Sequence, residues 1–177
     1  MASTFYIVGV PFVLYGWQQG QMAPFASATF VLMATLGNLL LYWQFATGRN
    51  NRYADPSLTV PQMLLAIVST LIFTGGASAS LRPTVSLGLL APLIFGCFQL
   101  QQKQLLRLAL FAIAGYGLML LTVELASGLN SPVVEVVHWG GLSLMLGAFV
   151  AICGEITRMR DRQRQLSAQL QESADRD

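Results

Sequence analysis

Residues 136–157 read VVHWGGLSLMLGAFVAICGEIT and continue without interruption into RMRDRQRQLSAQLQESADRD at 158–177. The first segment is apolar and, at about 1.5 Å rise per residue, long enough to cross the hydrocarbon core of a bilayer. Across the junction, apolar residues recur alternately four and three positions apart, a heptad pattern typical of a parallel coiled coil. We call this set the seam; it comprises Ile152, Ile156, Met159, Gln163, Leu166, Leu170 and Ser173.

The seam predicts a weak coil, because Gln163 and Ser173 are polar. A weak coil fused to a membrane helix suits a signal relay, whose alternative packings differ by only about a few kcal/mol. We therefore expect this helix to pair two copies of the chain in a homodimer and to carry a signal along the seam. The residues expected to relay it are Ile152, Ile156, Met159, Leu166 and Leu170. The alternative is a polar cytoplasmic tail that is simply helical.

Composition indicates an all-α polytopic membrane protein. Hydrophobic residues make up 54% of the 177 positions and charged residues 10%, whereas soluble domains carry about 25% charged residues. A net charge of +2 is too small to indicate a nucleic-acid partner. The single histidine and the lack of a phosphate-binding glycine loop, a nucleophile elbow or an HExxH motif argue against an enzyme.

Apolar runs predict six transmembrane helices at about 20 residues each. They cover residues 4–18, 24–45, 61–77, 84–100, 105–125 and 136–157. We expect residues 1–157 to form a six-helix transmembrane domain and residues 158–177 to begin a cytoplasmic coiled-coil signalling helix.

Basic residues predict the orientation of these spans. Arg82 alone falls on one side of the predicted bundle, and the other nine of the ten basic residues fall on the opposite side. The positive-inside rule assigns the richer side to the cytoplasm, so both termini are expected there. The nine residues are Arg49, Arg52, Lys103, Arg107, Arg158, Arg160, Arg162, Arg164 and Arg176.

Ionisable residues near the outer end of the bundle are candidates for a ligand site, because such groups are costly inside a membrane. The candidates are Glu124, Glu135 and His138, with Trp139, Arg82 and Asn38 as further ligand contacts. Two carboxylates and an imidazole are suited to a cationic ligand or a metal ion, and His138 alone is suited to sensing pH. The alternative is that all three are hydrated at the interface, with Arg82 paired to one of them. No metal site is assigned.

The loop after the second span contains Arg49, Arg52 and Asp55. Asp55 before Pro56 predicts a helix N-terminus. The two arginines are expected to bind lipid phosphates or to pair with Asp55 or with Glu155, which would couple the loop to the root of the last helix. The alternative is a solvated loop that only sets topology. Glu155 is also expected to pair with Arg158 one turn later.

Cys97 and Cys153 lie in separate apolar runs. Their spacing matches neither a disulfide framework nor a metal motif, so both are expected to be small packing residues.

The stretch Arg52-Tyr-Ala-Asp-Pro-Ser-Leu-Thr-Val-Pro-Gln-Met63, after a hydrophobic hairpin, resembles the amino-terminal membrane region (MASE-like) of bacterial diguanylate cyclases. The turn from Gln99 to Arg107 and the exit into a charged helix extend the resemblance. It implies a sensor domain in the bacterial inner membrane, coupled in cis to a GGDEF cyclase domain. Related membrane modules also precede class III nucleotide cyclases and histidine kinases, so the resemblance implies an input role more firmly than any one output. No GGDEF sequence follows Asp177, so the residues themselves are not expected to be catalytic.

A membrane sensory domain that regulates a cytoplasmic output domain is therefore the leading hypothesis. A hydrophobic small molecule or lipid entering between the spans is a further candidate signal. The alternatives are a small transporter or channel subunit, which would need a polar path through the bundle, and a stand-alone membrane scaffold.

Overall fold

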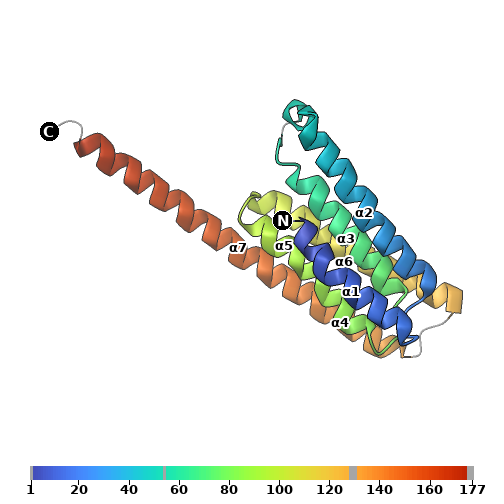
Figure 1. Cartoon of the computed structure of the whole chain (residues 1–177). Helices are drawn as coiled ribbons and strands as arrows, with labels where there is room; N and C mark the ends of the chain where they lie inside the picture. The colour runs from blue at the N-terminus through green and yellow to red at the C-terminus, as the bar shows by residue number, and fades with distance from the viewer. Residues whose placement is uncertain (1, 54, 128–130, 175–177) are drawn as a thin grey trace.

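A computed structural model describes residues 2–53, 55–127 and 131–174 (Figure 1). Its regular secondary structure is helical, as predicted, apart from one isolated bridge. The helices are α1 (Ala2–Gln18), α2 (Pro24–Ala46), α3 (Thr59–Gly75), α4 (Arg82–Ser86), α5 (Leu90–Cys97), α6 (Gln102–Ser127) and α7 (Pro132–Ala174), with the short 3-10 helices η1 (Arg49–Arg52) and η2 (Leu87–Leu89). Because α4, η2 and α5 follow one another directly, the helices form six rods.

Three helical stretches in the described part are long and apolar enough to cross a membrane: Pro24–Ala46, Gln102–Ala126 and Pro132–Ser167. Thr59–Gly75 and Arg82–Cys97 are apolar but shorter. The structure therefore supports a multi-pass membrane protein, with three helices of crossing length against the six spans predicted.

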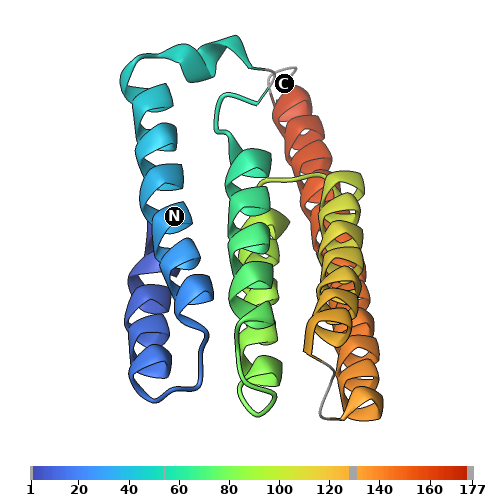
Figure 2. The same ribbon diagram turned by 90° about the vertical axis from the view of Figure 1, so that its right-hand side faces the viewer.

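The rods lie side by side and their connections gather at two ends (Figure 2). The α2–α3 and α5–α6 connections lie at the end from which α7 projects, which we call the exit end. The α1–α2, α3–α4 and α6–α7 connections lie at the other, far end. There, Met22 and Ala77 form an isolated antiparallel bridge that ties the first two of these connections together.

Helix α3 is the central element, because it packs against α1, α2, α4, α5 and α6. One buried cluster joins α3 to α5, α6 and α7 through residues such as Ile67, Leu93 and Tyr116. A second joins it to α1, α2 and α4 through Phe30 and Phe73. Helix α7 belongs only to the first cluster, where it packs against α5 and α6.

Proline and glycine set two of the boundaries. Pro92 has no N–H to donate to the carbonyl of residue 88, and the helix tightens into η2 directly before α5. Gly48, at φ +66°, occupies the left-handed position that commonly follows a helix end, and α2 stops there.

Helix α7 is far longer than any other described helix, at 43 residues, and its carboxyl-terminal part projects beyond the bundle (Figure 1). Within the bundle one face is buried, through Glu135, Leu142, Leu146, Val150 and Cys153. The seam residues Ile152, Ile156, Met159 and Leu166 lie on a different face and are exposed. The side chains of Leu170 and Ser173, and Arg176, lie outside the described part.

Candidate functional site

A buried ion pair joins the starts of α4 and α7 at the far end. The Arg82 guanidinium donates through Nη1 to Oε1 of Glu135, and through Nη2 to the Ala77 carbonyl oxygen at 3.1 Å. Arg82 is 6% exposed and Glu135 4%. The predicted pairing of Arg82 with a nearby carboxylate is confirmed, but the expectation that Glu135 is hydrated at the interface is wrong.

Several polar atoms around this pair have no hydrogen-bond partner among the described residues. They are Nε of Arg82, Oε2 of Glu135, the Tyr116 hydroxyl oxygen and Nδ1 of His138. Tyr116 is fully buried on α6, with Glu135, Arg82 and Ser86 as its polar surroundings. Sequence reasoning missed Tyr116, because a tyrosine in an apolar helix is ordinarily an interfacial or packing residue.

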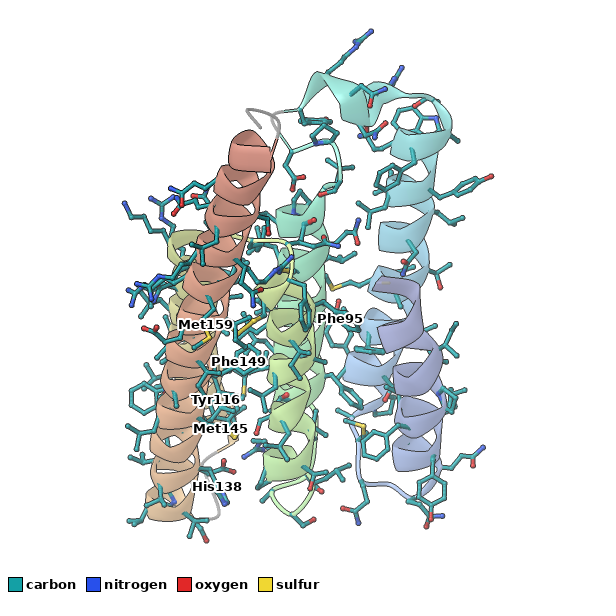
Figure 3. The ribbon with its side chains drawn as sticks, turned by 90° about the vertical axis from the view of Figure 1, so that its left-hand side faces the viewer. Phe95, Tyr116, His138, Met145, Phe149 and Met159 are labelled. Atoms are coloured by element: carbon teal, nitrogen blue, oxygen red, sulfur yellow. A yellow bond between two sulfur atoms is a disulfide. The ribbon has the colours of Figure 1, made fainter. Side chains whose placement is uncertain are left out.

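Trp139 packs α7 against α6. Its indole Nε1 donates to the Ile113 carbonyl oxygen at 3.0 Å. The ring lies against Gly117, where an added Cβ would stand 3.4 Å from ring atoms. His138 lies one position earlier on α7 and is half-buried (Figure 3).

The other predicted ligand contacts do not join the ion pair. Glu124 is exposed near the end of α6. Asn38 lies on α2, and its side-chain amide donates to the Ala34 carbonyl oxygen at 2.6 Å within the same helix. Among the described residues, no group of three or more histidine, cysteine, aspartate or glutamate side chains is placed to hold a metal ion. The structure therefore does not bring Glu124, Glu135 and His138 together as one metal-binding group.

At the exit end, Asp55 caps the start of α3. Its carboxylate accepts hydrogen bonds from the backbone N–H of Thr59 at 2.9 Å, from the Ser57 N–H at 3.1 Å and from the Ser57 hydroxyl. The hydrogen bond from the Ser57 hydroxyl is the main reason that the pKa of Asp55 lies below its usual 3.8. The short helix predicted to begin at Asp55 and Pro56 does not form: α3 begins at Thr59, after Leu58 at φ +51°, and Asp55 accepts the N–H of that first helical residue.

The capped turn is bonded to the end of the α5 rod. The Thr59 hydroxyl donates to Oε1 of Gln99 at 2.7 Å. On the other side of this segment, Arg160 of α7 donates to the Phe98 carbonyl oxygen at 3.4 Å. The loop and the root of α7 are thus connected through residues 98–99, which sequence reasoning did not single out.

The arginines of the loop do not make the ion pairs that were expected of them. Arg49 lies over the Trp43 ring, 4.3 Å from its centroid. Among the described residues the ion pairs are Arg82–Glu135 and Arg158–Glu155, so neither Arg49 nor Arg52 is paired with Asp55 or Glu155. The predicted Glu155–Arg158 pair is confirmed at 2.5 Å on the exposed surface of α7.

Cys97 and Cys153 form a disulfide, so their assignment as packing residues is wrong. The bond joins the end of α5 to α7 across 56 residues of sequence, with the two Cα atoms 5.4 Å apart. It is the yellow sulfur–sulfur bond drawn in Figure 3. Cysteine spacing carries no signal for it, because the pairing depends on which helices are neighbours.

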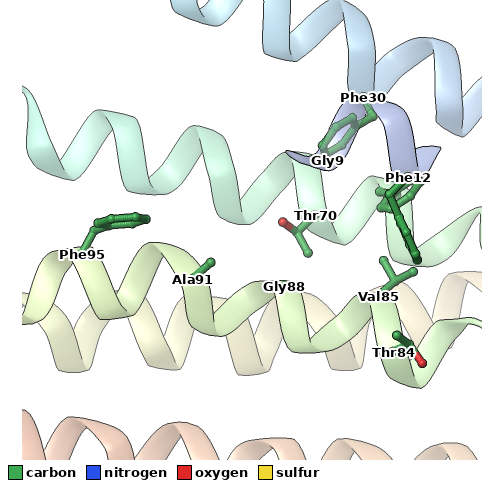
Figure 4. Close-up of a pocket in the computed structure, with 10 residues that line it drawn as sticks. Gly9, Phe12, Phe30, Thr70, Thr84, Val85, Gly88, Ala91 and Phe95 are labelled. Carbon is green, nitrogen blue, oxygen red and sulfur yellow. The ribbon is translucent and has the colours of Figure 1, made fainter. Parts of the chain in front are cut away.

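An apolar pocket of about 450 Å³ lies among α1, α2, α3 and the α4–α5 rod, on the side of the bundle away from α7 (Figure 4). Phe12, Phe30 and Phe73 form its aromatic end, with the Phe30 and Phe73 ring centroids 5.0 Å apart. The Thr70 hydroxyl on its wall already donates to the Ala66 carbonyl oxygen. Such a lining is suited to hydrocarbon rather than to a polar molecule.

No protein-family model, curated protein or solved structure matches this chain.

We expect Arg82→Met to lower the free energy of unfolding by about 3–5 kcal/mol, because it leaves Glu135 buried without its partner. The double variant Arg82→Met/Glu135→Met should recover most of this loss. Unfolding in mixed micelles with increasing sodium dodecyl sulfate measures the free energy of unfolding of the single and the double variant. Arg158→Met, which breaks the exposed pair, is the control and should cost about 0–1 kcal/mol. Equal losses for the two arginine variants would contradict the role assigned to the buried pair.

We expect Asp55→Ala to destabilise the start of α3 by about 1 kcal/mol, because it removes the cap. The pKa of Asp55 is lower in the folded state than its usual 3.8. The stability that the ionised carboxylate contributes is therefore complete above pH 3.8 and is lost as the pH falls through the folded-state pKa. Amide hydrogen exchange at Thr59 reports the loss. Asp55→Asn is the matched control, because it keeps a capping oxygen but does not titrate; acid sensitivity at Thr59 in that variant would assign the effect to another group.

Proposed function

We propose that this chain is the sensory input domain of a bacterial inner-membrane signalling protein, with both termini cytoplasmic. In this proposal all six rods cross the membrane, and α7 carries a change in bundle packing to a cytoplasmic output domain in cis. The resemblance of the loop at residues 52–63 to diguanylate cyclases names that cyclase as the leading output domain. The chain itself is proposed to be non-catalytic.

The observation that carries the proposal is the continuity of α7. One helix starts at the buried ion pair, packs against α5 and α6, and continues beyond the bundle without interruption to Ala174. A change in packing at the bundle is therefore transmitted through backbone hydrogen bonds rather than through a flexible linker.

The exposed seam supports pairing of two copies through α7. Met159 is 66% exposed and Leu166 54%, although both are large apolar side chains beyond the bundle. Water-exposed apolar residues repeating in a heptad pattern are stabilised when a second, parallel helix covers them. Arg160 and Arg162 flank the seam and would bring like charges together in a dimer, so the coil should be marginally stable and stabilised by salt.

The same face of α7 continues into the bundle region. Exposed Gly141, Met145 and Ala148 lie on it, and a Cβ added to Gly141 would meet nothing within 4 Å. Small residues allow close approach of membrane helices, so a second α7 can lie against this face within the bilayer as well.

The apolar pocket is the proposed point of signal entry for a hydrophobic small molecule or a lipid chain. It lies between α1 and the α4–α5 rod, and that rod is bonded to α7 at both of its ends, by Arg82–Glu135 and Cys97–Cys153. An occupant that displaces the rod would therefore act on α7.

We expect Leu166→Glu to weaken dimerisation about tenfold or more, because a carboxylate buried in the seam costs at least about 1.4 kcal/mol. Native mass spectrometry of the chain in nanodiscs measures the dimer fraction. Gln165→Glu is the matched control, since it adds the same charge one position away, on a face turned from the seam. A dimer that tolerates Leu166→Glu as well as it tolerates the control would contradict pairing through this seam.

We expect Ala91→Phe to reduce the apolar molecules retained by the protein, because the larger side chain fills the pocket it lines. The same mass spectra measure retained lipid or ligand. Ala114→Phe, at an exposed position of α6, adds the same ring outside the pocket. Retention that falls equally in both variants would point to general lipid binding.

A further inference from the structure

We propose that Cys97–Cys153 is a reversible redox site, opened by a small cytosolic thiol of the glutathione type, and that its state regulates α7. The inference rests on the proposed function, in which the exit end faces the cytoplasm and α7 is the output helix.

The position of the disulfide sets it apart from a permanent structural bond. It lies at the exit end, where Lys103 follows the start of α6 and Arg158 and Arg160 follow Cys153 on α7. This clustering of positive charge indicates the cytoplasmic side. Cytosolic thiols keep cysteines reduced, and the disulfides found there are mostly transient ones with catalytic or redox-sensing roles.

A polar pocket of about 320 Å³ lies against one of the two disulfide residues. Cys97 lines it together with Gln99, Gln101 and Thr157, whereas Cys153 does not. Arg160 also lines it, so its mouth carries a positive charge that attracts a thiolate and the carboxylates of a glutathione-type molecule. Cys97 is 5% exposed and Cys153 2%, so a local opening at the pocket reaches Cys97 first.

The exchange is balanced with the thiol as the only reductant. A small thiolate attacks Sγ of Cys97, the Sγ–Sγ bond breaks, and Cys153 leaves as a thiolate that takes up a proton. A second thiolate then attacks the small-molecule sulfur of the mixed disulfide and releases Cys97 as a thiolate, which is also protonated. Two small thiols are oxidised to one disulfide, and the two protein sulfurs gain the two electrons and two protons. The oxidised small molecule reverses both steps.

Reduction removes the covalent connection between the α5 rod and the root of α7. Beside it, the hydrogen bond from Arg160 to the Phe98 carbonyl oxygen is long, at 3.4 Å. Cys153 lies one turn before Ile156 of the seam, so the bond restrains α7 at the point where the seam leaves the bundle. We expect α7 to be held against α5 when oxidised and released from it when reduced.

The test uses the full chain in nanodiscs, equilibrated with mixtures of reduced and oxidised glutathione over cytosolic ratios. Mass-tagging with a maleimide counts free thiols, and amide hydrogen exchange follows residues 150–167. We expect the thiols to titrate within the series, with several-fold faster exchange on reduction. Cys97→Ser should exchange like the reduced protein in every mixture. The wild-type series alone decides the proposal if that variant does not fold.

A disulfide that remains intact throughout the series would overturn the proposal in favour of a structural bond, and thiols that stay reduced throughout would overturn it as well. Thiols that titrate without any change in exchange would remove the regulatory role. Native mass spectra of the same samples test the proposed function separately: a monomer in every mixture would contradict the seam while leaving the thiol titration intact.

Discussion

The ion pair between Arg82 and Glu135 is the constraint on which the arrangement of α7 depends. Both charges are buried, and an unpaired charge in apolar surroundings is costly. The pair therefore holds the first turn of α7 against the first turn of α4, and separating the two helices there would expose two charges to an apolar medium. Four polar atoms around it, on Arg82, Glu135, Tyr116 and His138, have no hydrogen-bond partner among the described residues. Trp139 adds a hydrogen bond to α6 directly beside it.

The exit end is organised differently, by local hydrogen bonds and one covalent bond. Asp55 fixes the start of α3, Thr59 bonds to Gln99, and the disulfide joins the same α5 terminus to α7. The α2–α3 loop and α7 are thus connected through residues 97–99 rather than directly. The α2–α3 loop is consequently connected to α7 through the α5 rod, the same rod that lines the apolar pocket.

Hydropathy was sufficient to predict the helical class and the six rods, because apolar runs separated by turn residues are local features. The contacts between helices join residues that are far apart in the sequence, so they could not be predicted in the same way. Arg82 and Glu135 were recognised as possible partners, but their burial depends on α4 beginning beside the first turn of α7. Cys97 and Cys153 pair only because α5 and α7 are neighbours, which no spacing reveals. The contacts of Arg49 were missed because Trp43, one turn before the end of α2, offered a nearer partner than any carboxylate.

Because α7 is long, a sideways movement near its start becomes larger toward its far end. With its pivot at Glu135, the disulfide acts about 27 Å along the helix, and the last described turn lies about 58 Å along it. A sideways movement of about 1 Å at Cys153 is therefore roughly doubled at the tip of a stiff helix. A displacement at Cys153 can be too small to disturb the packed core. At the tip of α7 the same displacement is as large as the helix shifts that occur at interfaces in switching proteins. In the proposed function, α7 would in this way enlarge a small movement at the bundle while the packed interior stays rigid.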